Sequence, residues 1–338
     1  MKAMVYHTYG SPDVLQCEEV AKPVPTDNQV LLRVRAAALN ALDVGLMKGR
    51  PYFARLFFGF PNPKITRPGR DVAGEVEAVG RSVTRFKPGD AVFGACSGES
   101  WMDKADGAFA EYACTVEKAL AIKPSNITFE QAASLAVAGL TALQGLRDKG
   151  KLQPGQRVLI NGAGGGVGTF AVLIAKALGG EVTAVSNSRN IDLMHALGAD
   201  HVIDYSQADF TKSGQRYDII FDCHPSHSPL ACRRILSSDG IYVAVGGPTG
   251  PLAGAFVRML VTVFLAFVVS RFASRKVVMF VAKVRDEDLR TLGELVASGK
   301  VTPVIEKSYR LRETAQAMRD LDAGQSRGKL VVSLGTGQ

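Results

Sequence analysis

The sequence predicts a soluble α/β protein of two domains, in which a β-rich N-terminal part precedes a doubly wound parallel sheet. The length of 338 residues exceeds what one hydrophobic core usually covers. Hydrophobic residues make up 46% of the chain and charged residues 21%, a balance typical of globular rather than disordered proteins. Strand-like segments dominate to about residue 120, and strands alternate with helices from about residue 125.

The N-terminal part contains short strand candidates that are separated by turn residues. They are QVLLRVRAAAL (29–39), DVAGEVEAVG (71–80), DAVFGA (90–95) and GAFAEYACT (107–115). The first ten residues alternate like a strand and lack the apolar run of a secretory signal, so we expect a cytoplasmic protein. The five cysteines form no C-x-x-C pair, and we interpret them as free thiols.

The second part alternates apolar strands with helical segments. The strand candidates are RVLIN (157–161), EVTAVS (181–186), HVIDY (201–205), YDIIFDC (217–223), IYVAVGG (241–247) and KVVMFVA (276–282). A helix is expected over 285–299, and a strand, a helix and a final strand follow to the end of GKLVVSL. Such short, mostly apolar strands are typical of a parallel sheet that helices cover on both faces.

A glycine-rich turn separates the strand at 158–161 from a helix expected over 169–178. Glycines at such a turn let backbone N–H groups approach the pyrophosphate of a dinucleotide, and the helix N-terminus presents its positive end. A merely tight structural turn is the alternative, but the following strand also falls where a dinucleotide fold requires it. The expected pyrophosphate-binding residues are Ala163, Gly164, Gly165, Gly166, Val167 and Gly168.

The end of the next strand indicates which dinucleotide binds. NAD sites usually carry Asp or Glu at this position, whereas this chain has Ser186, Asn187 and Arg189. Neutral donors and a cation suit a 2′-phosphate, and each charge-assisted bond to it contributes roughly 1.5–3 kcal/mol. We therefore expect NADPH as the cofactor, the alternative being that Arg189 only solvates the start of a helix.

With these residues placed, the whole chain resembles the medium-chain dehydrogenase/reductase superfamily. It is most similar to the zinc-independent quinone oxidoreductase branch, which includes zeta-crystallin-like and reticulon-interacting-protein-like members. The resemblance implies a GroES-like β-barrel catalytic domain over 1–124, a Rossmann NADPH-binding domain over 125–283 and a return to the catalytic domain over 284–338, with the active site between them. The matching segments are LNALDVGLMKG, GRDVAGEVEAVG, RFKPGDAVFG, GAFAEYA, AASLAVAGLTALQGL, GAGGGVG, LGADHVIDY and GQSRGKLVV.

The resemblance also implies individual site residues. Asn40 is expected beside the acceptor oxygen or the nicotinamide ribose, although a helix-capping asparagine is the alternative. Tyr52 would donate a hydrogen bond to a developing oxyanion, with Phe53 as the other candidate for that position. Tyr205 is expected beside the 2′-phosphate, and Gly246 belongs to the expected cofactor-binding set.

The sequence predicts no zinc site. Zinc-dependent relatives carry Cys and His in the segments that here hold Asn40 with Asp43, and Arg70 with Asp71. Their structural zinc requires four closely spaced cysteines, whereas residues 90–115 contain only two. Without a Lewis acid, the expected substrates are those that accept hydride readily.

We therefore expect an NADPH-dependent reductase of quinones, with a preference for lipophilic ones. An enoyl or 2-alkenal reductase that saturates an α,β-unsaturated carbonyl is the first alternative, because it requires the same cofactor and a similar apolar cleft. The second alternative is a non-catalytic NADPH-binding scaffold.

Net charge and one apolar segment bear on partners. The formal charge of +8 comes mostly from scattered basic residues without a nucleic-acid-binding signature, so we expect no nucleic acid. Residues 251–270 form the most apolar window, which Arg258 interrupts. Burial in a homodimer interface or in the substrate cleft is favoured, and peripheral contact of 251–285 with an anionic membrane surface is the alternative.

Overall fold

The computed structural model describes residues 1–50, 52, 55–97, 106–245 and 276–335, and these divide into two compact units. Unit 1 comprises Met1–Leu140 and Lys283–Gln338, and unit 2 comprises Thr141–Ala282. The chain therefore leaves unit 1, completes unit 2 and returns. This division keeps residues 125–140 with unit 1, whereas the sequence led us to begin the nucleotide-binding domain at 125.

Unit 1 is built on a seven-stranded sheet and a separate two-stranded sheet. The long strand β3 organises the larger sheet, because β4 pairs along one of its edges while β6 and β15 share the other. The strands of unit 1 are β1 (Lys2–Val5), β2 (Gln16–Glu19), β3 (Gln29–Ala38), β4 (Asp71–Val79), β5 (Ala91–Ala95), β6 (Tyr112–Val116), β7 (Leu120–Ile122), β14 (Ile305–Arg310) and β15 (Lys329–Ser333). The pairing of β15 with β3 joins the last strand of the chain to the N-terminal sheet.

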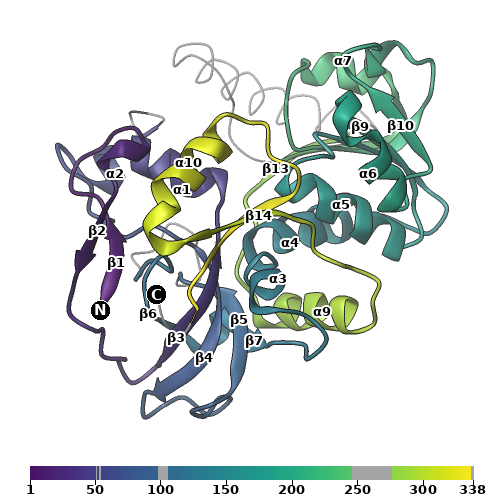
Figure 1. Ribbon diagram of the computed structural model, residues 1–338. Helices are drawn as coiled ribbons and strands as arrows, with labels where there is room; N and C mark the ends of the chain where they lie inside the picture. The colour runs from purple at the N-terminus through teal and green to yellow at the C-terminus, as the bar shows by residue number, and fades with distance from the viewer. Residues whose placement is uncertain (51, 53–54, 98–105, 246–275, 336–338) are drawn as a thin grey trace. The chain divides into compact units, whose positions relative to one another are not determined.

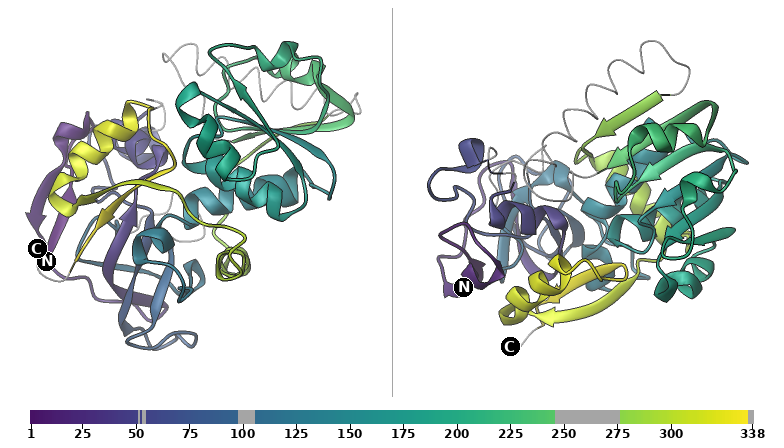
Figure 2. Two further views of the ribbon diagram at one scale, coloured as in Figure 1. Left: turned by 45° about the vertical axis from the view of Figure 1, so that its right-hand side comes forward. Right: turned by 90° about the horizontal axis from the view of Figure 1, so that it is seen from above.

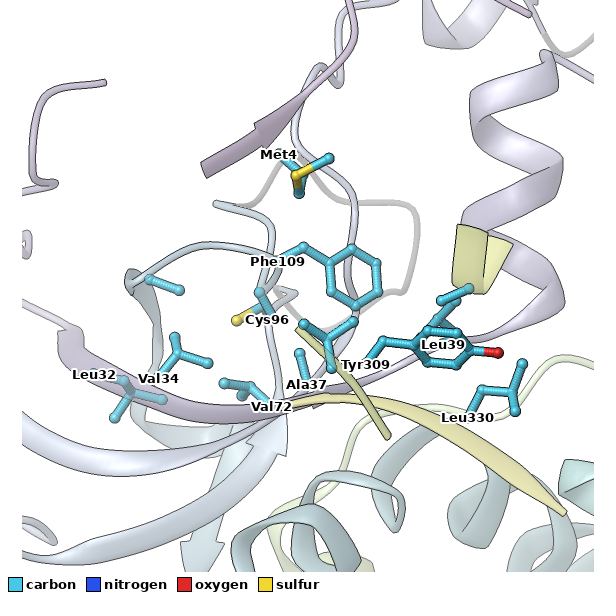
Figure 3. Packing of buried hydrophobic residues seen from close by; sticks show 14 of the residues in the cluster. Met4, Leu32, Val34, Ala37, Leu39, Val72, Cys96, Phe109, Tyr309 and Leu330 are labelled. Carbon is cyan, nitrogen blue, oxygen red and sulfur yellow. The ribbon is translucent and has the colours of Figure 1, made fainter. Parts of the chain in front are cut away.

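Apolar side chains of these strands form one core. Leu32 and Val34 of β3, Val72 of β4 and Leu330 of β15 are all almost fully buried together with Phe109 (Figure 3). The helices are α1 (Ala41–Lys48), α2 (Arg55–Phe58), α3 (Phe129–Ala133), α4 (Ala136–Leu143, which continues into unit 2), α9 (Asp286–Ala297) and α10 (Thr314–Asp322). The C-terminal helix α10 packs beside α1 (Figure 1).

Unit 2 contains a six-stranded parallel sheet in the order β10-β9-β8-β11-β12-β13. Its strands are β8 (Arg157–Asn161), β9 (Glu181–Ser186), β10 (His201–Asp204), β11 (Tyr217–Asp222), β12 (Leu236–Val245) and β13 (Lys276–Phe280). The helices α5 (Gly166–Ala177), α6 (Ile191–Ala196) and α7 (Pro229–Arg234) pack on the sheet (Figure 2). The strand order reverses between β8 and β11, which is the point where ligands bind in doubly wound sheets.

The predicted fold class, a β domain combined with a doubly wound parallel sheet, is confirmed. Several boundaries differ from the sequence-based expectation, and strand β12 begins five residues before the expected 241. Helix α5 begins at Gly166 and not at 169, because Gly165 is extended at its N-cap and the next three residues already form the first turn. Strand β6 covers only the second half of the 107–115 candidate, since Phe109 hydrogen-bonds to β1 through an isolated contact with Met4.

Candidate functional site

The glycine turn of unit 2 connects the end of β8 to the start of α5. The Ala163 N–H donates to the Val185 carbonyl of β9 at 3.0 Å, which ties the turn to the neighbouring strand. A Cβ at Gly168 would overlap the Gly162 carbonyl oxygen and lie 2.6 Å from the Ala163 Cα, so close packing of the helix against the strand requires glycine there. Internal packing is therefore sufficient to explain why residue 168 is glycine.

Gly165 is different, because nothing in the described structure requires it to be glycine. Its φ of −82° is open to any residue. A Cβ there would meet only the Gly162 carbonyl oxygen, at an ordinary 3.6 Å. Glycine at a helix N-terminus, where neither the backbone conformation nor the packing of the protein requires it, is expected where a ligand phosphate closely approaches the backbone.

A polar corner lies where β9 meets α6, beside the glycine turn. The Asn190 Nδ2 group donates to the Ser186 Oγ at 3.1 Å, and both side chains are almost fully buried. A Cβ at Gly164 would overlap the Asn190 amide nitrogen and lie 2.8 Å from the Ser186 Oγ. Gly164 therefore gives the turn room to pack against this corner.

Two amide oxygens at this corner are buried without a hydrogen-bond partner among the described residues: the Oδ1 atoms of Asn187 and Asn190. Buried polar atoms normally have partners, so these two oxygens fit a partner that the chain itself does not supply, either a ligand or water. Together with the open position at Gly165, they fit a dinucleotide with its pyrophosphate at the turn and its adenosine ribose at the corner. Asn190 did not stand out in the sequence, where it reads as an ordinary residue at a helix start.

A carboxylate of β10 also reaches the corner. The Ser188 hydroxyl donates to the Asp204 Oδ2 at 2.5 Å, and the Ser206 hydroxyl and N–H donate to its Oδ1 at 2.7 and 2.9 Å. These hydrogen bonds hold the pKa of Asp204 below its ordinary value, so the group is a carboxylate at neutral pH. Tyr205, the next residue in the sequence, is exposed, and its backbone N–H donates a hydrogen bond to the Ser186 carbonyl. This negative charge is not evident from the residues at the end of β9, where the carboxylate of an NAD site is expected.

Unit 2 contains a second buried polar group at the point where the strand order reverses. Asp222, at the end of β11, accepts hydrogen bonds from the Asn161 Nδ2 at 2.9 Å, the Tyr242 hydroxyl at 2.6 Å and the His224 N–H at 3.1 Å. Burial nevertheless raises the pKa of Asp222, with these bonds opposing the shift. This network fixes the carboxyl ends of β8, β11 and β12 next to the glycine turn.

Unit 1 brings Asn40, Asp71 and Lys329 together from three strand ends. Ala38 at the end of β3 is in register with Asp71 at the start of β4 and with Val331 of β15. The Lys329 Nζ donates to the Asn40 Oδ1 at 2.7 Å and pairs with the Asp71 Oδ2 at 3.0 Å. The Asn40 Nδ2 donates to the same Asp71 oxygen at 3.0 Å.

A second carboxylate supports this group from helix α1. The Asp43 Oδ2 accepts from the Asn40 N–H at 2.9 Å, and its Oδ1 accepts from the Gly69 N–H at 3.1 Å. Burial raises the pKa of Asp43 to about 6, while nearby Arg70 lowers it and nearby Asp71 raises it. Asn40 therefore occupies the N-cap position of α1, as the alternative interpretation of the sequence had it, and also takes part in a buried polar group.

Tyr52 lies in a different setting. Its side chain is 44% exposed, and the Arg55 guanidinium lies 4.6 Å from the centre of its ring and 4.5 Å from that of Tyr9. The same guanidinium donates to the Lys48 and Gly49 carbonyls at the end of α1. Arg55 therefore anchors the Tyr52 ring. The expected sites Phe53 and Gly246 and the segment 251–270 lie outside the described residues.

Comparison with known proteins assigns the family. The description "Alcohol dehydrogenase GroES-like domain" matches residues 26–125, and "Zinc-binding dehydrogenase" matches residues 197–332. A chloroplastic quinone oxidoreductase of Triphysaria versicolor is 33% identical over 98% of each chain. A chloroplastic NADPH-dependent alkenal/one oxidoreductase of Arabidopsis thaliana is 32% identical over 98% of this chain and 79% of that protein. The solved quinone oxidoreductase of Coxiella burnetii is 30% identical over 99% of both chains, with a TM-score of 0.84.

The chain belongs to the medium-chain dehydrogenase/reductase superfamily, in the quinone oxidoreductase branch. As a member it is an oxidoreductase with a GroES-like domain and a Rossmann domain. The described residues contain no group of three or more His, Cys, Asp and Glu side chains placed to hold a metal ion. The absence of zinc stays a prediction, and so does each proposed role of a site residue. Every helix in the described part of the chain is too short or too polar to cross a bilayer.

Proposed function

We propose that the protein is an NADPH-dependent, zinc-independent oxidoreductase that transfers hydride to a quinone. The observation that carries the proposal is the glycine turn, where Gly165 is open and the neighbouring Asn187 and Asn190 have unpartnered amide oxygens. These features support a dinucleotide in a family whose relatives are named as quinone and alkenal/one oxidoreductases. When bound, the dinucleotide supplies the hydride, and the protein binds, orients and shields it.

The proposed cofactor-binding residues divide by the part of the dinucleotide that they would contact. The turn, formed by Ala163, Gly164, Gly165, Gly166, Val167 and Gly168, would hold the pyrophosphate. Ser186, Asn187, Arg189 and Tyr205 would hold the adenosine ribose and its 2′-phosphate, and Gly246 completes the proposed set. Arg189 is the cation at this corner that suits a phosphate, while Asp204 opposes it.

Asn40 and Tyr52 are the proposed residues at the reacting end. Asn40 is 7% exposed and held by three charged neighbours, which suits a fixed contact to the cofactor. Tyr52 is exposed, and the Arg55 guanidinium packs against its ring. The Tyr52 hydroxyl could therefore donate a hydrogen bond to the oxyanion that forms when a quinone oxygen gains negative charge. Both roles require only positioned hydrogen bonds and no Lewis acid.

The second candidate is reduction of an α,β-unsaturated carbonyl, which the similarity to an alkenal/one oxidoreductase favours. A non-catalytic NADPH-binding scaffold is the third. Stopped-flow oxidation of bound NADPH by a panel of quinones and a panel of enones separates the three. Fast oxidation by quinones supports the main proposal, fast oxidation by enones alone supports the second, and oxidation by neither leaves the scaffold.

The preferred acceptor and the assembly are also part of the proposal. We propose a lipophilic quinone as acceptor and a cytoplasmic homodimer as the working form. Residues 251–270 would be buried in the dimer interface or in the substrate cleft, and contact of 251–285 with an anionic membrane surface is the alternative. The charge of +8 and the apolar window at 251–270 support the last two points. Analytical ultracentrifugation tests the dimer, and sedimentation with anionic against neutral vesicles tests the membrane contact. A KM that falls as the quinone tail lengthens supports the lipophilic acceptor.

A further inference from the structure

The buried group at the end of β3 leaves the Asn40 amide with few hydrogen-bonding possibilities. Its Nδ2 donates to the Asp71 carboxylate at 3.0 Å and, over a longer 3.4 Å, to the Ala38 carbonyl. Its Oδ1 accepts from the Lys329 ammonium at 2.7 Å. Because an amide has two N–H donors and two acceptor positions on oxygen, both donors are engaged and one acceptor position on Oδ1 remains.

The two charged neighbours also prevent the amide from rotating. A flip of the Asn40 side chain would place Nδ2 against the Lys329 ammonium, donor against donor, and Oδ1 against the Asp71 carboxylate, acceptor against acceptor. Lys329 is 2% exposed and Asp71 is 0% exposed, so water cannot relieve either mismatch. Asp71 is held in turn by the Val137 N–H, which donates to its Oδ1 at 2.7 Å.

We propose that Lys329 and Asp71 are positioning residues that lock the Asn40 amide so that Oδ1 is the atom offered to a ligand. An acceptor of this kind suits a ribose hydroxyl of the bound dinucleotide and cannot stabilise an oxyanion, which needs a donor. This inference rests on the proposed function, and it chooses between the two roles that the sequence left open for Asn40. Asn40 then acts on cofactor affinity and not on the oxygen of the acceptor.

The test compares Lys329→Met with Lys329→Arg, which keeps the charge. A double variant, Lys329→Met with Asp71→Asn, avoids an uncompensated buried carboxylate and covers the case in which the single variant does not fold. Lys123→Met is the matched control, because the ammonium of this part-buried lysine lies near the Phe129 ring and, among the described residues, donates to the main-chain carbonyls of Pro124 and Ile127 and to no side chain. Circular dichroism verifies folding for each protein.

The first readout is the Kd of NADPH alone, measured by nucleotide fluorescence, alongside the KM of a quinone at saturating NADPH. We expect the Kd to rise roughly fivefold or more in the Met and double variants, and the quinone KM to stay within about twofold. Lys329→Arg should restore most of the affinity, and Lys123→Met should match the unmutated protein. A raised quinone KM with an unchanged Kd would overturn the proposal and assign Asn40 to the acceptor oxygen.

The second readout needs no ligand, which separates this inference from the proposed function. In the unmutated protein, the Asn40 side-chain NH₂ signals in ¹⁵N NMR should be protected from solvent exchange. The protection should fall most in the double variant, which removes the Asp71 carboxylate that accepts from this group. Unprotected Asn40 signals in the unmutated protein would refute the lock itself. If the signals are protected as expected but NADPH does not bind, the proposed function fails while the lock stands.

Discussion

Two neighbouring glycines of the unit 2 turn should respond in opposite ways to the same substitution. Gly165→Ala adds a methyl group whose nearest protein atom, apart from the residues next to it in sequence, is 3.6 Å away. Gly168→Ala adds a methyl group that would overlap the Gly162 carbonyl oxygen. If the first glycine exists for a ligand and the second for packing, the first variant should lose binding and keep its stability. The second should lose stability.

The magnitudes follow from the contacts. At Gly168 the clash is with backbone atoms, which cannot move aside as a flexible side chain can, so we expect a loss of about 1–3 kcal/mol in the free energy of unfolding. At Gly165 alanine is a poorer N-cap but also restricts the unfolded chain, and the two effects nearly cancel, to within about 1 kcal/mol. Loss of two charge-assisted bonds to the pyrophosphate would weaken NADPH binding by about a hundredfold.

Urea unfolding followed by circular dichroism gives the stabilities, and fluorescence titration with NADPH gives the affinities. Affinity is compared only at urea concentrations where both proteins are folded. A Gly165→Ala protein that binds NADPH as tightly as the unmutated protein would show that the backbone there does not face a phosphate. The assignment of the whole turn to the pyrophosphate would then fail with it.

Three further predictions concern the 2′-phosphate corner, the titration of Asp43 and the absence of zinc. We expect the unmutated protein to prefer NADPH over NADH by about tenfold, and Arg189→Ala should remove most of this preference. Asp204→Asn should increase the preference, because it removes a charge that repels the 2′-phosphate and releases the Ser188 hydroxyl. Equal Kd values for both cofactors in the unmutated protein would contradict the assignment. Burial raises the pKa of Asp43 to about 6, so the folded state binds more protons than the unfolded state between about pH 4 and 6. The free energy of unfolding should therefore decrease as pH rises through this range. Urea unfolding at several pH values should show a fall of up to about 3 kcal/mol that is missing in Asp43→Asn, and parallel curves for the two proteins would refute it. Exhaustive chelation should leave activity unchanged, and stoichiometric zinc lost together with activity would overturn the zinc-free proposal.

Most strands of unit 2 could be predicted closely because they are short apolar runs bounded by turn residues, whereas the polar first half of β12 was not predicted as strand. The order of these strands was not predicted, because a pattern of alternating strands and helices indicates a parallel sheet but does not specify which strands are neighbours. The start of α5 was misplaced by three residues because glycine has a low helix propensity, and here tertiary packing against β8 overrides it. Asp204 was not predicted because it lies at the end of β10, whereas the carboxylate of an NAD site is expected at the end of β9.

The polar group of unit 1 shows why the family resemblance indicated Asn40 but not its partners. Lys329 is 289 positions from Asn40 in the sequence, and the pairing of β15 with β3 brings the two residues together. The Leu39 N–H extends this pairing by donating to the Leu330 carbonyl. No local pattern specifies which strand pairs with which. A local signal does exist, however: Asp71 and Lys329 each stand at the first position of an apolar strand, and Asp222 stands at the last position of another. A charged residue in such a position enters the core with its strand and must find a partner there, because burying it unpaired costs several kcal/mol. Strand ends that carry a charge into an apolar run are therefore the places where polar partners from distant segments should be sought first.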